Sequence, residues 1–245
     1  MERSVDIAVV GAGFAGMYMV HRARAANLSV QVFEAGTDVG GTWYWNRYPG
    51  ARCDIESVEY SYSFDNDLQQ EWEWNQRYAG QPEILTYAQH VADRFDLRRD
   101  IQFSTRVTSA IFNEKSNNWR VTTDKDDVVT ARFVVFATGC LSSTNVPQFI
   151  GADSFTGPTY HTGEWPHDGV DFTGKTVGLI GTGSSAIQSI PIIAEQSKHL
   201  TVFQRTATYS IPARNDTIDK EYVKEVKENY NEFRDLNRQQ MGAFG

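Results

Sequence analysis

A glycine pattern occurs twice in this 245-residue chain, with a constant offset of 170 residues between the copies. The offset relates Gly11 to Gly181, Gly13 to Gly183 and Gly16 to Ala186. It also relates Phe33 to Phe203, so the two stretches align without a gap. A repeat of this length describes a supersecondary unit rather than a short motif. We therefore expect two related strand–turn–helix–strand units, which is an α/β arrangement.

The first copy has the local pattern of a dinucleotide-binding unit. The expected elements are a strand at residues 7–10, a helix at 17–26 and a strand at 29–33. Gly11 suits a tight turn, Gly13 lets a pyrophosphate approach the backbone, and Gly16 allows close helix–strand packing. Glu34 follows Gly11 by 23 residues, where a carboxylate can accept hydrogen bonds from ribose hydroxyls. The alternative is an ordinary glycine turn.

The second copy differs from the first in its chemistry. Strands are expected at residues 175–180 and 200–203, with a helix at 187–196 between them. Ala186 takes the third glycine position, which the motif tolerates. The counterpart of Glu34 is Gln204, and Arg205 follows it. A carboxylate would repel a 2′-phosphate, whereas a guanidinium binds one. The first site therefore favours a free ribose, as in FAD, and the second favours NADP, unless Arg205 is only a solvated cation at the end of a strand.

Two dinucleotide sites in one chain indicate electron transfer from a nicotinamide to a flavin. The expected fold class is α/β with two Rossmann-like domains. The expected boundaries are 1–145 for the flavin domain, 146–174 for a linker rich in proline and glycine, 175–211 for part of the NADP domain, and 212–245 for the start of a helical segment.

Four further segments have recognisable patterns. Residues 85–95 have helical spacing, and His90 on this covering helix is expected to be a surface or packing residue. Residues 101–135 break into short β-type runs, which predicts a meander inserted in the first domain. Residues 133–139 read as a buried strand that opens into a turn. Residues 219–240 read as one charged helix with a packing stripe at Tyr222, Val226, Tyr230 and Phe233.

An aromatic segment at residues 40–54 does not fit a core helix or strand. Two glycines, a Pro-Gly pair and three large aromatic residues predict a structured loop. Arg52 and Asp54 are costly to bury without partners. Its aromatic rings can wall in a planar ring, with Asp54 beside a polar partner. Packing alone is the alternative.

Composition excludes several classes of protein. A formal net charge of −8 argues against binding to a nucleic-acid backbone. The two cysteines, Cys53 and Cys140, are too few for a disulfide framework and lack the spacing of a metal site or a redox pair, which sets aside disulfide reductase chemistry. The apolar run at residues 7–20 is too short to span a membrane, and Glu2 and Asp6 argue against a signal peptide. We expect a cytoplasmic protein.

Two longer signatures resemble those of a known family. Phe155-Thr-Gly157-Pro-Thr-Tyr-His161-Thr-Gly-Glu-Trp165-Pro166 resembles the FxGxxxHxxxWP signature of the Baeyer–Villiger monooxygenases, between two glycine motifs as in that family. The stretch from Gly40-Gly41-Thr42-Trp43 to Asp54 resembles the family's second signature. The likeness runs along the whole chain and looks closest to the phenylacetone, cyclohexanone and steroid monooxygenase branch of these class B flavoproteins.

The resemblance implies an NADPH-dependent, FAD-containing enzyme that uses O₂ to turn ketones into esters or lactones through a C4a-peroxyflavin. It implies a catalytic role for Asp54 and a role for His161 in coupling the domains. It places FAD against Gly11, Gly13, Gly16, Glu34, Gly41, Thr42, Trp43, Asp54, Tyr60 and the backbone at Val107. It places Arg52, Cys53 and Asp54 near the nicotinamide, and NADP against Gly181, Thr182, Gly183, Ser184, Ser185, Ala186, Gln188, Arg205 and Thr206.

Members of the family continue well beyond the position of Gly245, so the resemblance covers only the family's N-terminal portion and implies a truncated chain. The family's active-site arginine, which pairs with the counterpart of Asp54, has no equivalent here. Two alternatives remain: an N- or S-oxygenating flavin monooxygenase, and an inactive dinucleotide-binding fragment. A monomer with no nucleic-acid partner and no membrane span is the expected state.

Overall fold

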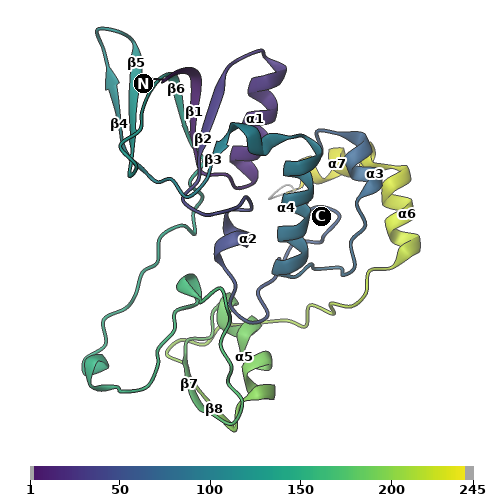
Figure 1. The fold of residues 1–245 in the computed structure, drawn as a ribbon. Helices are drawn as coiled ribbons and strands as arrows, with labels where there is room; N and C mark the ends of the chain where they lie inside the picture. The colour runs from purple at the N-terminus through teal and green to yellow at the C-terminus, as the bar shows by residue number, and fades with distance from the viewer. Residues whose placement is uncertain (1–2, 241–245) are drawn as a thin grey trace. The chain divides into compact units, whose positions relative to one another are not determined.

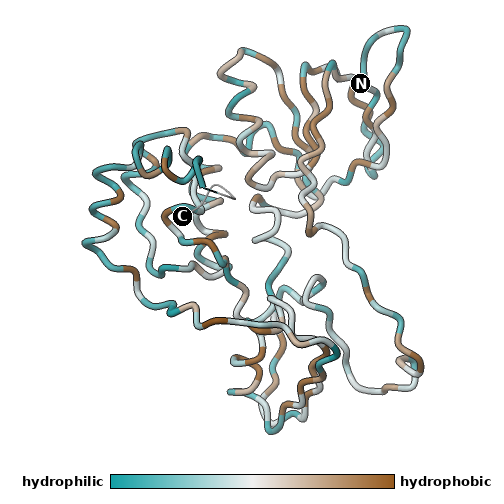
Figure 2. The backbone as a smooth tube through the Cα atoms, turned by 180° about the vertical axis from the view of Figure 1, so that it is seen from behind, coloured by the Kyte–Doolittle hydropathy of each residue, from teal (hydrophilic) through white to brown (hydrophobic). Residues whose placement is uncertain are grey.

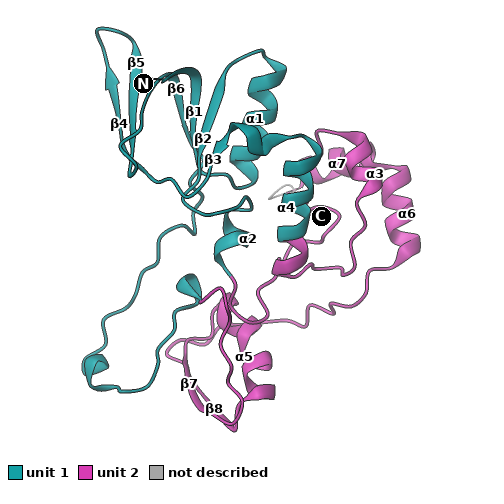
Figure 3. Ribbon diagram, viewed as in Figure 1, with its two compact units in different colours: residues 1–46, 85–165 teal, residues 47–84, 166–245 magenta. Residues whose placement is uncertain are grey.

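The computed structural model describes residues 3–240 (Figure 1). It divides into two compact units, each built from two separate stretches of chain (Figure 3). Unit 1 comprises residues 1–46 and 85–165, and unit 2 comprises residues 47–84 and 166–245. Residues 47–84 thus pack with the later part of the chain. The domain boundaries expected from the sequence concern cofactor binding, and they stay a prediction.

Unit 1 contains a six-stranded sheet in the order β3-β2-β1-β6-β5-β4. Its strands are β1 (Arg3–Val10), β2 (Val30–Phe33), β3 (Ile101–Gln102), β4 (Val107–Asn113), β5 (Asn118–Thr123) and β6 (Val128–Phe136). β1 pairs in parallel with β2 and β6, and β2 with β3. β4, β5 and β6 form an antiparallel meander. The meander is therefore confirmed from Val107 onward, whereas β3 extends the parallel part of the sheet.

Three helices and three short 3₁₀ turns complete unit 1. The helices are α1 (Phe14–Ala25), α2 (Thr42–Trp45) and, apart from its first turn, α4 (Gln81–Arg94); the 3₁₀ turns are η1 (Leu97–Asp100), η2 (Ala152–Ser154) and η3 (Thr162–Glu164). α4 starts earlier than the sequence predicts because Pro82 is tolerated in a first helical turn. The predicted helix is present, and Ala88, Val91 and Ala92 on it are fully buried.

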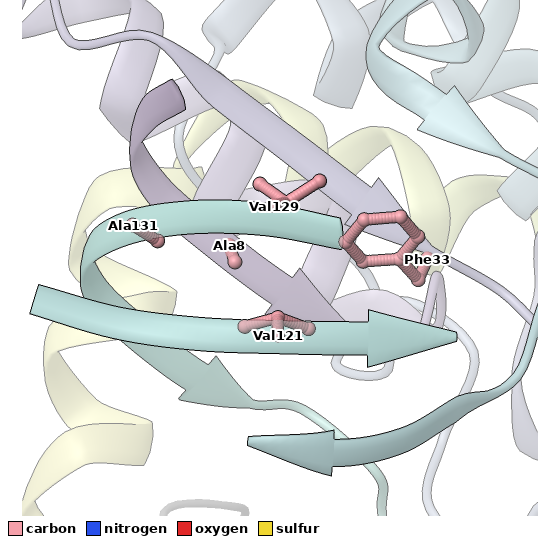
Figure 4. Close-up of a cluster of buried hydrophobic side chains, with 5 residues drawn as sticks. All are labelled: Ala8, Phe33, Val121, Val129 and Ala131. Atoms are coloured by element: carbon pink, nitrogen blue, oxygen red, sulfur yellow. The ribbon is translucent and has the colours of Figure 1, made fainter. Parts of the chain in front are cut away.

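The core of unit 1 joins the parallel strands to the meander. Ala8, Phe33, Val121, Val129 and Ala131 form one buried cluster drawn from β1, β2, β5 and β6 (Figure 4). Apolar burial of this kind is the main favourable contribution to folding. The meander is thus part of the same hydrophobic core and not a separate appendage.

The expectation of a buried strand at residues 133–139 is wrong for the end of β6. Phe133 is 52% exposed and Phe136 is 59% exposed. β5 pairs with β6 only as far as Ala131, so the last residues of β6 are bonded to β1 alone. An apolar run indicates side chains that favour burial, but it does not show whether another layer of the protein covers them.

Unit 2 contains the second strand–turn–helix–strand unit. β7 (Thr176–Ile180), α5 (Ser184–Gln196) and β8 (His199–Phe203) follow in the predicted order, and the two strands pair in parallel. The unit also holds α3 (Asn66–Glu71), α6 (Lys220–Glu228) and α7 (Tyr230–Gln239). Figure 2 shows the contrast in hydropathy between the mostly hydrophilic α6–α7 stretch and the apolar strands of the unit 1 sheet.

The single charged helix predicted at residues 219–240 is two helices. Asn229 breaks it with φ −127° and ψ 28°, outside helical geometry. Of the predicted packing stripe, Val226 and Tyr230 are buried on either side of the break, whereas Tyr222 and Phe233 are only partly buried and Val223, outside the predicted stripe, is buried. Helical periodicity is unchanged by one irregular residue, which explains why the sequence pattern conceals the break.

Candidate functional site

The first glycine turn is tightly packed in unit 1. Gly11 has φ +102°, and its N–H donates to the carbonyl of Phe33 at 2.8 Å. A Cβ added to Gly11 would lie 2.6 Å from the carbonyl oxygen of Ala137, just after β6. A Cβ added to Gly16 would lie 1.9 Å from the carbonyl oxygen of Gly11. The turn and the close packing expected at Gly11 and Gly16 are therefore present.

The helix that follows this turn begins without a side-chain cap. Gly13 is the N-cap of α1, with φ −75° and ψ −170°. The N–H groups of a first helical turn, together with the helix dipole, favour an anionic ligand such as a pyrophosphate. A Cβ added to Gly13 would lie 3.3 Å from Cα of Gly41, so glycine here permits a close backbone approach. The uncapped N–H groups of α1 fit the diphosphate of a dinucleotide.

Glu34 lies at the end of β2 and is 5% exposed. Its Oε2 accepts from the N–H of Ala12 at 2.7 Å, and its Oε1 accepts from the N–H of Gly36 at 2.7 Å. The carboxylate thus connects the glycine turn to the end of β2. A carboxylate offers about four acceptor positions, so ribose hydroxyls can still bind. The sequence predicts the acid but does not reveal these two backbone partners.

The second signature meets the glycine turn. The N–H of Gly40 donates to the carbonyl of Ala12 at 3.1 Å. Gly41 has φ +53°, and a Cβ added there would lie 2.8 Å from Cα of Gly13. Thr42 then begins α2, and Trp43 is 7% exposed. Glycines 28 residues apart are thereby brought together with Glu34 near one helix terminus.

Two other predicted residues lie elsewhere in unit 1. Val107 begins β4 and packs against the cluster of Figure 4. His161 is the N-cap of η3, and its Nδ1 accepts from the N–H of Gly163 at 3.1 Å. Trp165, later in the same signature, is 7% exposed and lies 5.7 Å from the ring of Tyr160. This histidine has a structural partner within its own turn.

The second glycine turn, in unit 2, has nearly the same local geometry as the first. Gly181 has φ +108°, and its N–H donates to the carbonyl of Phe203 at 2.9 Å. Gly183 is the N-cap of α5, with φ −74° and ψ −178° and no side-chain cap. Each of these features repeats its counterpart 170 residues earlier. The surroundings differ, because a Cβ added to Gly181 or Gly183 would meet no atom within 4 Å.

The chemical difference between the copies is also present. Gln204 donates through Nε2 to Oγ1 of Thr182 at 2.9 Å. Thr182 is the counterpart of Ala12, so this bond takes the place of the bond from Ala12 to Glu34. Arg205 and Thr206 are exposed just beyond it. Ser184, Ser185 and Ala186 form the first turn of α5, next to the uncapped N–H groups. The residues present fit a dinucleotide with an additional phosphate.

Residues 47–54 lie against α5 within unit 2. Gln188 of α5 accepts through Oε1 from the hydroxyl of Tyr48 at 2.9 Å and from the N–H of Arg52 at 3.3 Å. Its Nε2 donates to the carbonyl of Arg52 at 3.1 Å. Gly50 has φ +75°, and a Cβ added there would lie 2.2 Å from the carbonyl oxygen of Gln188. The sequence places these residues in separate motifs, and the folded chain brings them together.

The three residues expected near the nicotinamide differ in environment. Arg52 donates through Nη1 to Oε1 of Gln76 at 3.3 Å and to the carbonyl of Tyr78 at 3.2 Å. Cys53 is buried, and burial raises the pKa of its thiol to about 11. Asp54 is exposed, and within residues 3–240 no cationic side chain lies within ion-pair distance of its carboxylate. Tyr60 is half-buried in the same unit.

Both cysteines are free thiols, Cys53 buried and Cys140 exposed. Across residues 3–240, none of the helices combines the length and apolar character needed to cross a bilayer.

Comparison with known proteins identifies the family. The model of the pyridine nucleotide-disulphide oxidoreductase family matches residues 8–240. A Baeyer-Villiger monooxygenase from Pseudooceanicola batsensis is 48% identical over 98% of this chain and 44% of its own length. Phenazine N-monooxygenase PhzNO1 from Lysobacter antibioticus is 46% identical over 98% of this chain and 44% of its own length. The chain spans less than half the length of these curated relatives.

Solved structures agree with this relationship. A structure described as oxidized steroid monooxygenase bound to NADP has a TM-score of 0.94 and 61% identity, covering 98% of this chain and 46% of its own. A structure of OTEMO in complex with FAD and NADP has a TM-score of 0.93 and 44% identity, covering 100% of this chain and 47% of its own. The chain belongs to the pyridine nucleotide-disulphide oxidoreductase family, and within it to the homologues of the Baeyer–Villiger monooxygenases.

Proposed function

We propose that this chain forms the FAD- and NADPH-binding part of a Baeyer–Villiger monooxygenase that converts ketones, with O₂, into esters or lactones. The observation that carries the proposal is the pair of glycine turns with matching geometry, one followed by Glu34 and the other by Gln204 and Arg205. FAD supplies the oxygen chemistry when bound, and NADPH supplies the hydride. The relatives' names support oxygenation as the use of these two cofactors.

The residues of this chain distinguish the two dinucleotides by their charge and hydrogen bonding. The N–H groups in the uncapped first turns of α1 and α5 donate hydrogen bonds to the two pyrophosphates. Glu34, already oriented by Ala12 and Gly36, accepts the ribose hydroxyls of FAD and rejects a 2′-phosphate by charge repulsion. Arg205 and Thr206 are exposed where they can hold the 2′-phosphate of NADPH, and Arg205 supplies charge-assisted hydrogen bonds.

The other residues that the resemblance indicates have proposed roles. In unit 1 we assign Gly41, Thr42, Trp43 and the Val107 backbone to the flavin site, next to the glycine turn. Tyr60, in unit 2, is assigned to FAD on the family resemblance alone. Asp54 is the exposed catalytic carboxylate, with Arg52 and Cys53 before it in the segment that faces the nicotinamide. His161 stabilises the turn at η3 and so the course of the linker. We further propose a cytoplasmic monomer, for which the two free thiols are the support on location.

A second function is favoured by one specific observation. The phenazine N-monooxygenase is nearly as similar to this chain as the Baeyer-Villiger monooxygenase is. Oxygen transfer to an aromatic nitrogen uses the same two cofactors, so the sites described above suit either reaction. The substrate therefore distinguishes the two functions, and the dinucleotide sites do not.

The test uses the full-length protein that contains this chain, purified with its bound flavin. NADPH consumption is followed with a cyclic ketone and, separately, with a phenazine, and the products are identified by mass spectrometry under ¹⁸O₂. One ¹⁸O atom in an ester or lactone is the expected result. An N-oxide from the phenazine with no ester from the ketone supports the second function, and NADPH consumption that yields only hydrogen peroxide contradicts both.

The preference for NADPH tests the second site by itself. Arg205→Ala removes the proposed phosphate partner, and we expect the KM for NADPH to rise by about tenfold or more, since a charge-assisted contact is worth about 1.5–3 kcal/mol. The KM for NADH is expected to stay nearly constant because NADH lacks the 2′-phosphate. An equal rise in both KM values would show that Arg205 does not recognise the phosphate.

A further inference from the structure

The side chain of Gln188 makes three hydrogen bonds within the protein. Its Oε1 accepts two hydrogen bonds, from the Tyr48 hydroxyl and the Arg52 N–H, and its Nε2 donates one to the Arg52 carbonyl. An amide side chain has two acceptor positions and two N–H donors. Three of these four positions are therefore used, and two of them hold both main-chain groups of a single residue. The Gln188 amide thus bonds to the N–H and the carbonyl of Arg52 as the main chain of a neighbouring β-strand would.

The main chain at Gln188 also contacts the same segment. A Cβ at Gly50 would lie 2.2 Å from the carbonyl oxygen of Gln188 and 3.4 Å from Cγ1 of Ile192. Gly50 has a positive φ, which most side chains disfavour, so glycine meets two requirements at this position. The segment from Tyr48 to Arg52 consequently lies directly on α5, next to the first turn that we assign to the pyrophosphate of NADPH.

The opposite side of the segment is held as well. The Arg52 guanidinium donates to Gln76 and Tyr78, and the N–H of Cys53 donates to the carbonyl of Ala79 at 3.1 Å. Residues 52 and 53 are thus bonded on one side to α5 and on the other to residues 76–79. Asp54 is the first residue beyond these bonds, and it is exposed.

We propose that Gln188 is a positioning residue: it sets the main chain at Arg52, and thereby the Asp54 carboxylate two residues later, against the NADP-binding helix. In this role it does not bind the dinucleotide itself, although it lies in the motif that does. The inference rests on the proposed function, because Asp54 has a role to be positioned for only if hydride transfer and oxygenation occur. Small displacements of a reacting group cost about 10²-fold in rate when geometry matters.

The experiment uses the full-length flavoprotein and three variants. Gln188→Met keeps the length of the side chain and removes its hydrogen bonds, and Tyr48→Phe removes one partner only. The third is the double variant. Gln196→Met is the matched control, since Gln196 lies at the end of the same helix and its Oε1 accepts from the N–H of Phe172 at 3.5 Å. FAD content and the visible spectrum of the flavin report folding in each protein.

Three quantities separate positioning from binding. They are the Kd for NADP⁺, from the flavin difference spectrum; the limiting rate of flavin reduction by NADPH; and the fraction of consumed NADPH recovered as oxygenated product. For Gln188→Met we expect the reduction rate or the recovered fraction to fall about tenfold, with the Kd changed by no more than about twofold. Tyr48→Phe is expected to have a smaller effect in the same direction, and Gln196→Met none.

Non-additivity is the deciding result. Because Tyr48 acts through Gln188, the double variant is expected to be no worse than Gln188→Met alone, whereas independent sites multiply to within about twofold. A Kd raised about tenfold with an unchanged limiting rate, or an additive double variant, would overturn the positioning role. If Gln188→Met loses its flavin, Tyr48→Phe still decides: an unchanged rate and recovered fraction overturn the role. If NADPH does not reduce the flavin of the wild-type protein, the proposed function is overturned, and this role of Gln188 with it.

Discussion

Gly16 occupies a position where a side chain has no room. A Cβ there would lie 1.9 Å from a backbone oxygen, and the equivalent position of the second copy holds Ala186. The motif tolerates alanine in general, so the restriction comes from the packing of α1 against its own turn.

Gly11, Gly13 and Gly16 could be predicted from the sequence because each has a local role. The backbone partners of Glu34 could not, since they depend on where two loops meet.

Gly16→Ala is expected to force the turn and α1 apart, at a cost of about 1–3 kcal/mol. A lowered Tm and reduced retention of FAD, measured by thermal unfolding and flavin absorbance, are the expected results. Ala186→Gly is the matched control: it costs at most about 1 kcal/mol through helix propensity and leaves the flavin in place. Full flavin retention and an unchanged Tm in Gly16→Ala would show that the turn adjusts freely.

Cys53 and Cys140 are expected to differ in reactivity with alkylating agents. The thiolate is the reactive form, and burial raises the pKa of Cys53 to about 11, so both its charge state and its access disfavour reaction. At about pH 8, iodoacetamide should modify the exposed Cys140 first, as measured by peptide mass spectrometry. Equal labelling of the two peptides would contradict the buried position of Cys53.

The raised pKa of Cys53 makes the free energy of unfolding depend on pH between about 9 and about 11. The folded protein keeps the Cys53 proton at pH values where the unfolded chain has already lost it, because the pKa is raised from the ordinary value of 9.0 to about 11. The folded state therefore binds more protons in this interval, and the free energy of unfolding falls as pH rises through it. Cys53→Ser should flatten this part of the pH profile in chemical denaturation.

At the scale of elements, α6 and α7 show what a periodic pattern conveys. The pattern predicts one amphipathic helix with a packing stripe; Val226 and Tyr230 of that stripe are buried, and Val223 is buried where the stripe had Tyr222. It does not locate the break at Asn229 or the surface on which the helices pack. That surface is formed by residues 56–73 of the same unit, which are more than 140 positions away in the chain.

Arg234 is the main polar anchor of α7 on this surface. Its guanidinium donates to the carbonyl of Glu59 at 2.7 Å, to Oγ of Ser61 at 2.7 Å and to Gln69 at 3.3 Å. Arg234→Met leaves these acceptors without their donor, and we expect a loss of about 1–3 kcal/mol in the free energy of unfolding, measured by urea denaturation.

Arg238 is the control on the same helix. It pairs with Asp235 on the surface, and both side chains are 65% exposed. Exposed ion pairs contribute about 0–1 kcal/mol, so Arg238→Met is expected to change stability little. Equal effects of the two substitutions would mean that α7 is not anchored through Arg234.

At the scale of the whole molecule, the two copies of the repeat differ in their protection. β1 has bonded strands on both sides, and Ala8 and Val9 are fully buried. Among the residues that the structure describes, β7 and β8 form a two-stranded sheet, and Ile180 and Phe203 are 66% and 56% exposed. Two-stranded sheets are marginally stable, and parallel strands normally have both faces covered.

Hydrogen exchange should therefore separate the copies in the 245-residue chain. We expect amides of β1, β2 and the first half of β6 to exchange slowest, and those of β7 and β8 faster by about two orders of magnitude or more, since local opening costs less free energy where fewer side chains are buried. Peptide-level exchange followed by mass spectrometry measures this. Comparable protection in both copies would show that the second unit is stabilised beyond what its two strands provide.

The repeat, the order of the elements within each copy, and the chemical contrast between Glu34 and Gln204–Arg205 can all be predicted from the amino-acid pattern. These features follow from glycine placement and hydrophobic periodicity over a few neighbouring residues, so they can be read locally. Four features become visible only in the folded chain: Gly41 lies against Gly13, Gln188 bonds to Arg52, residues 47–84 pack with the later part of the chain, and Phe133 and Phe136 are exposed. Contacts between distant residues depend on the path of the chain and on which layer covers each face, and neither is encoded in a local pattern.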